Sequence, residues 1–523
     1  MSLTAPSGPT TRRVGASGTQ LAELIWHRSL TAADRTYLRH ARTARTISFA
    51  DLRRVSVRWA ALLDDLGVGP GDAVGLAVSD PLDFAVVFLS TMAAGRVAAP
   101  LDPAAPDPEV AAVCARVGPQ VVVADRPAPD GAPCEWLMLP RGSFELAPDR
   151  SAGRPSSRPP VSPPAGIGGL VLSTSGTTGT PKLIRLTERR LLFRAGAIAA
   201  HHQLSVIDRG FSPLPLFHIN AEVVGLLSTL VAGAGLVVDD RFHRTDLWAL
   251  LDELGVTWVN AVPAIISRLV PLRPGETVPE RLRFVRSASA PLPPSTLARF
   301  EGATGLPVVE TYGMTEAASQ ITANPVSGPR KAGSVGVPVG IDLRVVGGDE
   351  GRLAPGEVGR VQIRGPGVIA GYDGSGYEDR FDDEGWLATG DLGTVDVDGY
   401  LFLVGREDDV INRGGEKILP REVEDVVAAE PAVTTVAVVG WDHAELGRVP
   451  VAYLVVEGVR GATDRDLAQE IVGRVAERCA RSLSKAKRPV AYHVVEHLPV
   501  GATGKVRRSH IEPASTVYSL LVS

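Results

Sequence analysis

Hydroxyl and glycine residues gather in one short run, STSGTTGTPK at 173–182, directly after an apolar strand-like stretch. Glycines let backbone N–H groups approach an anion, hydroxyls supply further donors, and Lys182 adds a mobile positive charge. The run is not a Walker A loop, because Leu183 rather than Ser or Thr follows the lysine. Composition alone leaves two interpretations open, a phosphate-binding loop and a solvated linker.

Eight short motifs occur along the chain in a fixed order. They are MAAG at 92–95 through PLD at 100–102, the loop above, PLFH at 215–218, ETYGMTE at 310–316, GSVG at 333–336, WLATGD at 386–391, GREDD at 405–409 and TGK at 503–505. In this order they resemble the acyl-adenylate-forming superfamily of acyl-CoA synthetases, peptide-synthetase adenylation domains and firefly luciferase, over about residues 49–508. Segments 286–291, 314–324 and 411–418 look most like the oxalyl-CoA synthetase branch.

The resemblance implies a reaction in two steps with ATP, Mg²⁺ and CoA. A carboxylate first attacks the α-phosphate of ATP to give an acyl-adenylate and pyrophosphate, and a thiol, most commonly that of CoA, then displaces AMP. The alternative acceptor is a carrier protein, or an amine or hydroxyl of another small molecule in natural-product biosynthesis. A non-catalytic nucleotide-binding protein is a third possibility, against which the intact Lys182, Glu316, Asp391 and Lys505 argue.

The resemblance also implies roles for individual residues. Tyr312 offers a flat face for adenine, Thr315 a hydroxyl for a phosphate oxygen, and Glu316 a hard carboxylate for Mg²⁺. Asp391 resembles the family's ribose-binding aspartate, and Arg406 the arginine that contacts ribose and phosphate. The complete nucleotide set is Thr174, Ser175, Gly176, Thr177, Thr178, Lys182, Ser289, Ala290, Glu310, Thr311, Tyr312, Gly313, Asp391 and Arg406.

Five further positions carry expectations about the carboxylate and the thiol. His218 resembles the histidine that orients the carboxylate or gates its tunnel, and Lys505 the mobile lysine that bridges carboxylate and α-phosphate. Asp408 resembles a hinge that turns the C-terminal domain so that Gly414 and Gly415 face the thiol. Taken singly, His218 is more typical of a hydrogen-bonded, partly buried histidine, Lys505 of a solvated lysine, and the glycine pair is also common in ordinary turns.

The expected acyl pocket is unusually polar for a fatty-acid tunnel. By its place in the fold it should be lined by His218, Ile219, Asn220, Asn260, Ala288, Thr311, Gly313, Met314, Ala318 and Ser319. An apolar chain would leave the Asn220 and Asn260 amides unsatisfied, at about 1–3 kcal/mol each. The pocket therefore favours a small polar acid, such as a short dicarboxylate or a hydroxy- or amino-benzoate. Two residues depart from the usual family pattern, Leu183 and Ser289, each at a position commonly held by glycine.

Strands and helices must alternate to position these motifs. Helical patterns at 52–63 and 84–94 flank an apolar strand at 74–78, and further strands are expected at 169–172, 236–238, 258–262 and 284–285. Residues 351–404 indicate a β-rich subdomain, and the chain beyond 408 returns to α+β. We therefore predict an α/β fold with a flexible leader (1–20), a large nucleotide-binding domain (21–407) and a small mobile α+β lid domain (408–523).

Composition limits the remaining classes of function. The chain has 523 residues and a net charge of −5, without a long run of one sign, so nucleic acid is not an expected partner. Cys114, Cys134 and Cys479 form no C-x-x-C pair, which fits a reducing compartment and a cytoplasmic enzyme. The apolar run 223–238 is too short and glycine-rich to cross a membrane and should be buried core.

Overall fold

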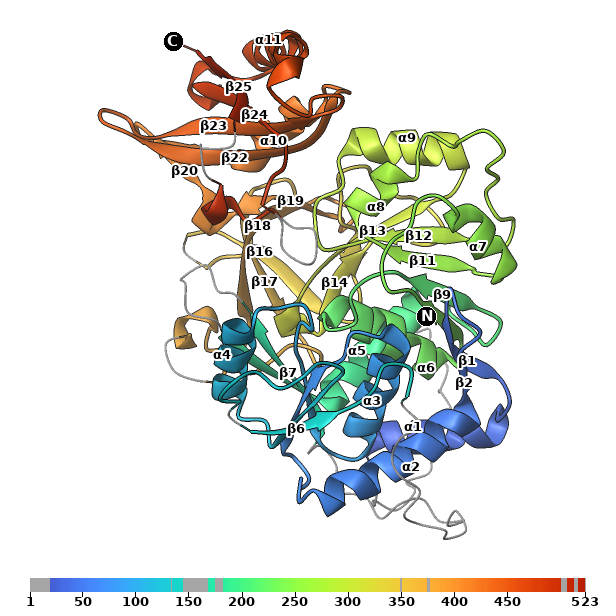
Figure 1. The fold of residues 1–523 in the computed structure, drawn as a ribbon. Helices are drawn as coiled ribbons and strands as arrows, with labels where there is room; N and C mark the ends of the chain where they lie inside the picture. Colours follow the sequence, from blue (N-terminus) through green and yellow to red (C-terminus); the bar gives the residue numbers. More distant parts are fainter. Residues whose placement is uncertain are drawn as a thin grey trace, which may run out of the picture.

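The computed structural model describes residues 19–132, 134–143, 168–174, 182–348, 350–373, 377–499, 506–511 and 516–522. Figure 1 shows a large body and a smaller domain, coloured orange to red, that lies at one end of it. This arrangement confirms the predicted α/β fold class, with a separate α+β domain at the C-terminal end. Within the described ranges, no helix has the length and apolar character needed to cross a membrane.

Two mixed sheets form the centre of the large body. The first has the order β15 (Val337–Pro338), β14 (Ser319–Ala323), β13 (Val308–Met314), β12 (Phe284–Ser287), β11 (Trp258–Ala261), β9 (Arg209–Ser212), β10 (Gly235–Val238), β1 (Thr36–His40) and β2 (Thr46–Ser48). The second has the order β6 (Glu135–Met138), β5 (Val121–Ala124), β3 (Ala73–Ala77), β4 (Val97–Pro100), β7 (Gly169–Thr174) and β8 (Lys182–Thr187). Their central strands are parallel and buried along their whole length, as expected for short apolar runs covered on both faces.

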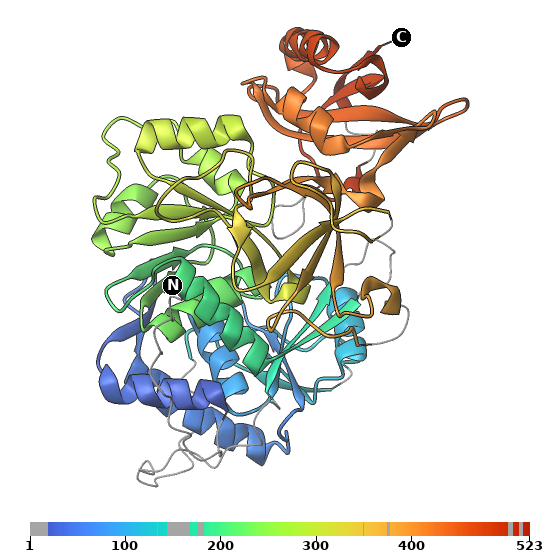
Figure 2. The same cartoon turned by 180° about the vertical axis from the view of Figure 1, so that it is seen from behind.

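Helices cover these sheets on both sides (Figures 1 and 2). They are α1 (Gln20–Thr31), α2 (Phe49–Asp65), α3 (Pro81–Ala93), α4 (Asp107–Val117), α5 (Glu188–His201), α6 (Ser228–Ala232), α7 (Leu247–Glu253), α8 (Pro263–Arg268) and α9 (Pro294–Thr304). The predicted helix at 52–63 is confirmed as α2, which a Ser48/Asp51 capping box starts and whose Leu52, Val55 and Trp59 face the core. The helix predicted at 84–94 is α3.

The apolar run 223–238 is buried core, as predicted, but its local form is unusual. Residues Asn220–Leu227 form a π-helix, η1, which continues directly into α6 and then β10. The hydroxyls of Ser228 and Thr229 donate back to the carbonyls of Val224 and Gly225, so these polar side chains are satisfied within the run. Wide helices of this kind occur most often at functional sites, and η1 begins at Asn220 of the expected pocket.

A smaller antiparallel sheet carries the chain towards the C-terminal domain. Its order is β16 (Asp342–Val346), β17 (Gly359–Arg364), β18 (Leu387–Val395) and β19 (Leu401–Arg406), which confirms the predicted β-rich subdomain. A short 3₁₀ turn, η4 (Glu407–Asp409), follows β19 and leads into the next domain.

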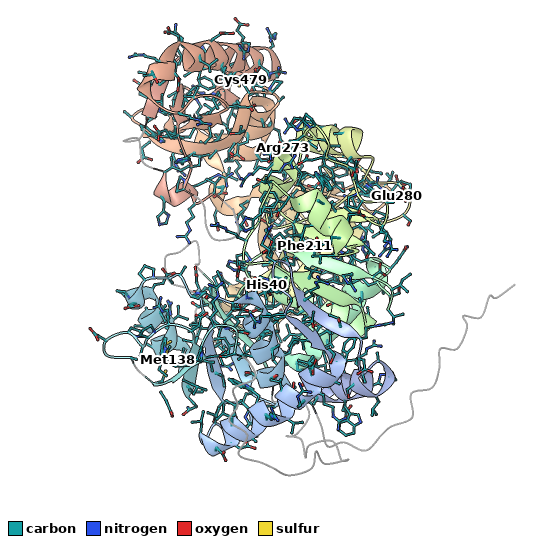
Figure 3. All side chains as sticks on the ribbon, turned by 45° about the vertical axis from the view of Figure 1, so that its right-hand side comes forward. His40, Met138, Phe211, Arg273, Glu280 and Cys479 are labelled. Atoms are coloured by element: carbon teal, nitrogen blue, oxygen red, sulfur yellow. The ribbon has the colours of Figure 1, made fainter. Side chains whose placement is uncertain are left out.

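The C-terminal domain has its own sheet and its own core. The sheet has the order β21 (Glu416–Ile418), β20 (Ile411–Arg413), β23 (Gly447–Val456), β24 (Ala491–Val495) and β25 (Thr516–Leu521), with β22 (Val433–His443) paired to β23. Helices α10 (Pro420–Ala428) and α11 (Arg465–Ser482) pack on it around Val427, Val472 and Cys479. Figure 3 shows Cys479 in this domain, well apart from Phe211 in the large body.

Candidate active site

The ends of β13, β18 and β19 bring three of the expected nucleotide-binding residues together. The Tyr312 hydroxyl donates to Oδ2 of Asp391, whose Oδ1 lies 3.2 Å from Nη1 of Arg406. Register explains the ion pair, because Asp391 on β18 stands opposite Arg406 on β19. Gly390, with φ of +78°, leaves room here, since a Cβ would lie 2.9 Å from the Arg406 guanidinium.

Glu316 and Lys182 lie beside the same cluster, in contact with two tyrosine side chains. The Tyr372 hydroxyl donates to Oε1 of Glu316 at 2.9 Å, while Nζ of Lys182 stands 5.1 Å from the Tyr372 ring centre and 4.5 Å from that of Tyr377. Burial and, after it, the positive charge of Arg380 lower the pKa of Lys182. Glu316 and Asp408 attract the ammonium, but in the described part of the chain it forms no ion pair within 4 Å, and its aromatic surroundings suit a phosphate-binding cation.

Glu316 fits the expected role in holding Mg²⁺. Its carboxylate is 9% exposed, and among the described residues the side-chain hydrogen bond it receives is that of Tyr372 to Oε1, which leaves Oε2 for a cation. Over the described part of the chain no three His, Cys, Asp or Glu side chains form a metal cluster. Mg²⁺ commonly takes one or two protein carboxylates and completes its shell with water and substrate phosphates, which one glutamate can serve.

Backbone strain marks the turns beside this cluster. Ser289, Ala318 and Ser319 have φ values of +72°, +51° and +90°, which side-chain-bearing residues rarely adopt. Ser289 is the position at which many family members have glycine, and the positive φ gives the physical reason for that preference. Gly313 cannot be replaced without movement, because a Cβ there would lie 1.8 Å from the Ser319 carbonyl oxygen.

His218 precedes η1 and is neutral in its surroundings. Burial lowers its pKa to about 4, and its Nε2 has no hydrogen-bond partner among the described residues. Phe217 packs against the ring with 4.5 Å between centroids. An uncharged imidazole with one free nitrogen can orient a substrate carboxylate through a hydrogen bond or gate the approach to it.

The expected pocket amides meet around a residue that the sequence analysis did not select. Arg286 on β12 donates from Nη1 to Oδ1 of Asn220 at 2.8 Å and of Asn260 at 2.9 Å, and Nη2 lies 3.4 Å from Oε1 of Gln320. A sequence signal existed, because an arginine inside the otherwise apolar buried strand FVRS is exceptional. Tyr372 and Tyr377 were missed as well, because nothing local links them to Glu316 and Lys182.

Other predicted residues are only partly placed. Ser175, Gly176, Thr177, Thr178 and Lys505 lie outside the described residues, as does the side chain of Thr174. The Thr311 hydroxyl donates to the Ser287 carbonyl, which fixes β13 against β12. The positions Ile219, Ala288, Ala290, Met314 and Thr315 border the strands and turns described above.

Glu310 is the expected nucleotide residue that the structure does not bring to the cluster. Its buried carboxylate accepts the Leu292 N–H and feels the charges of Arg421 and Asp425 on α10. Burial raises its pKa to about 7. Glu310 thus lies towards the C-terminal domain rather than with Asp391 and Glu316.

Gly414 and Gly415 form the exposed tip of the β20–β21 hairpin. Their φ values of +57° and +93° and the bond from the Gly415 N–H to Oδ1 of Asn412 account for both glycines by turn geometry. Asp408 is exposed within η4, between the two domains, where a hinge would have to lie. The hinge and thiol-facing roles remain expectations from the resemblance.

Comparison with protein families agrees with this geometry. Residues 26–373 match the model of the AMP-binding enzyme family, and residues 422–505 match that of the AMP-binding enzyme C-terminal domain. The chain belongs to this family. Its resemblance to the acyl-adenylate-forming superfamily is thereby confirmed, and the protein is an AMP-forming acid–CoA ligase.

The similarity to individual relatives extends over nearly the whole chain. The chain is 34% identical to a sulfoacetate–CoA ligase of Cupriavidus necator over 93% of its own length and 96% of the relative's. It is 34% identical to an oxalate–CoA ligase of Arabidopsis thaliana, over 92% and 94%. An o-succinylbenzoate CoA synthetase from Bacillus subtilis, solved with ATP and a magnesium ion, has 27% identity and a TM-score of 0.80, covering 93% of this chain and 98% of that one.

Proposed function

We propose that this family member activates a small polar carboxylic acid with ATP and transfers the acyl group to the thiol of CoA. The observation that carries the proposal is a pair of amides, the buried Asn260 and the half-buried Asn220 with its buried Nδ2, where a fatty-acid ligase would need an apolar tunnel. An alkyl chain packed there would cover polar groups without satisfying them. The relatives named for sulfoacetate, oxalate and o-succinylbenzoate act on compact acids with several polar oxygens, which supports the same size class.

The charged cluster supplies the chemistry of the first step. Asp391 can accept the ribose hydroxyls once Tyr312 and Arg406 hold it in place, and Tyr312 can stack on adenine. Lys182 and Arg406 offset the negative charge of the phosphates as the substrate carboxylate approaches the α-phosphorus. Glu316 would hold Mg²⁺, which supplies charge neutralisation at the phosphates when bound.

Carbon–sulfur bond formation requires the thiol to reach the mixed anhydride after pyrophosphate leaves. We infer that Asp408 is the hinge for a change of domain orientation and that Lys505 serves the adenylation orientation alone. The placement of η4 between two domains with separate cores supports this role.

Pyrophosphate exchange over a panel of acids tests the proposal. Small dicarboxylates, sulfo acids and substituted benzoates should support exchange, and acids of twelve or more carbons should not. CoA-dependent AMP release should exceed acyl-hydroxamate formation with hydroxylamine in place of CoA. Preference for long fatty acids would refute the substrate class, and equal rates with and without CoA would indicate a carrier protein or an amine or hydroxyl as the acceptor.

A further inference from the structure

Arg286 is a fully buried guanidinium without a negative partner. It is 2% exposed, and its three side-chain contacts are all neutral amides, from Asn220, Asn260 and Gln320. Among the residues that the structure describes, no carboxylate forms an ion pair with it. Burial alone lowers its pKa, to about 9, without a compensating acidic neighbour. Buried charges in proteins are otherwise paired, so this one marks a place for an anion.

Strand register creates the arrangement. Asn260 on β11 stands beside Arg286 on β12, so their side chains share one face of the parallel sheet. Asn220 at the start of η1 and Gln320 on β14 close the arrangement from two other elements. Four separate segments therefore converge on one guanidinium, in the middle of the pocket predicted for the acyl group.

The cluster around Arg286 has more hydrogen-bond donors than acceptors. A guanidinium has only N–H groups, so all three amides turn their oxygens towards it. Among the described residues, this orientation leaves Nδ2 of Asn220, Nε2 of Gln320 and Nε of Arg286 buried without acceptors. A carboxylate or sulfonate offers enough oxygen acceptors for all three and also negative charge, whereas a hydroxyl oxygen accepts at most two hydrogen bonds and carries no charge.

Other charged groups nearby do not offer the missing anion. The pKa values of His201 and His202 are lowered by burial and, after it, by the positive charge of Arg286, which favours the neutral imidazoles, and an imidazole supplies no negative charge in either protonation state. Glu222 is buried on η1, two residues after Asn220. Burial alone raises the pKa of its carboxyl group, with no contribution from a neighbouring cation, so the neutral acid is favoured.

We propose that the acid activated by this enzyme carries a second anionic group, a carboxylate or a sulfonate, which Arg286 binds together with the amide N–H groups of Asn220 and Gln320. The inference rests on the proposed function and names its substrate class. Arg286 lies near the end of β12, two residues before Ala288 of the predicted acyl pocket.

Matched pairs of acids test the inference with the wild-type enzyme. Malonate, succinate and sulfoacetate are each compared with a monoacid of the same length, propionate or butyrate, and with 4-hydroxybenzoate and 2-aminobenzoate. At least one diacid or sulfo acid should exceed its match by about 100-fold or more in kcat/KM for pyrophosphate exchange. A dicarboxylate optimum assigns a carboxylate, and a sulfoacetate optimum a sulfonate. Preference for a monoacid or a substituted benzoate overturns the inference but leaves the proposed function intact, whereas no exchange with any acid overturns both.

Two substitutions then assign the effect to the guanidinium. Arg286→Met should lower kcat/KM for the best diacid by at least about 30-fold and change that of its monoacid match by less than about threefold. Arg281→Met, an exposed arginine on the same approach to β12, is the control for loss of one positive charge and should leave both values unchanged. Equal losses for the diacid and the monoacid would contradict a specific role.

Asn260→Asp keeps the test decisive even if Arg286→Met fails to fold. The new carboxylate would stand where Oδ1 now lies, 2.9 Å from the Arg286 guanidinium. It would form an ion pair with the positive charge that the anionic group of the substrate otherwise neutralises. We expect thermal stability to rise while kcat/KM for the diacid falls by at least about 30-fold. A variant that is more stable and uses the diacid as well as the wild type does would refute the inference.

Discussion

Glu316 accepts a hydrogen bond from a neutral phenol, that of Tyr372, and within the described residues forms no ion pair with a cation. Asp391, by contrast, is already matched by Arg406 at 3.2 Å. The difference separates their tasks, because a carboxylate paired with arginine binds Mg²⁺ poorly. Lys182, resting on aromatic faces, likewise keeps its charge for a phosphate.

Glu316→Gln should abolish most Mg²⁺-dependent adenylation while leaving the fold unchanged. The amide keeps the shape and can still interact with Tyr372, but it carries no charge for the cation. We expect pyrophosphate release to fall by about 100-fold or more at saturating Mg²⁺, with an unaltered circular dichroism spectrum. An unchanged rate would remove the metal role from this residue.

Tyr372→Phe is the matched change on the other side of the same hydrogen bond. It removes the donor to Oε1 of Glu316 and keeps an aromatic face for Lys182. The Mg²⁺ concentration for half-maximal rate should rise a few-fold, with a small change in the maximal rate. A large drop in the maximal rate that Mg²⁺ does not rescue would show that the hydroxyl acts elsewhere.

Helix α5 begins at a buried glutamate that accepts a hydrogen bond from the start of α1. Glu188 is 2% exposed and accepts the Leu21 N–H, and burial raises its pKa to about 7. The unfolded chain loses this proton near pH 4.5, so between pH 4.5 and 7 the folded state binds more protons than the unfolded state. Stability contributed by this group therefore decreases as pH rises through that window and is constant above it.

Glu188→Gln should remove this pH dependence. Relative to the wild type, its free energy of unfolding should increase from pH 4.5 to pH 7, by up to about 3 kcal/mol, because an amide never ionises. Urea unfolding at several pH values measures the difference. A difference that does not change with pH would mean that Glu188 ionises normally in the folded protein.

Local patterns predicted the elements that obey simple periodicity. α2 and α3 were expected within a few residues of their observed ends, because each has a regular pattern of apolar residues. The π-helix η1 was not expected, since its wider turn depends on packing against the sheet rather than on local sequence. β1 and β2, at the far edge of the first sheet, were also missed, because β1 joins the sheet through β10, some two hundred residues away, and β2 pairs only with β1.

The nucleotide cluster could be predicted and the Arg286 cluster could not. Asp391, Arg406, Tyr312 and Glu316 belong to motifs that stand out individually, and the fold brings their side chains together. Arg286, Asn220, Asn260 and Gln320 come from four segments whose contact depends on strand register. Sequence alone showed the polarity of the pocket through its two asparagines but not the charge at its centre.

At the scale of the whole molecule, two substitutions should fail in opposite half-reactions. Lys505→Ala should slow adenylation by roughly 100- to 1,000-fold and leave thioester formation from supplied acyl-adenylate intact. Asp408→Pro should fix φ in η4, so that acyl-adenylate still forms while the CoA step is lost. Measuring both half-reactions for both variants is the test, with ATP binding as the folding control. Equal impairment of the same step would mean that Asp408 is not the pivot.

A single segment of the backbone, 407–410 between β19 and β20, connects the C-terminal domain to the large body. A short tether of this kind holds the small domain near the cleft at an effective concentration of the order of millimolar. Neither orientation then needs a large interface of its own, and weak contacts can be exchanged within each turnover. If the chain were cut in this segment, the separate domain would have to be added at about millimolar concentration to restore the full reaction.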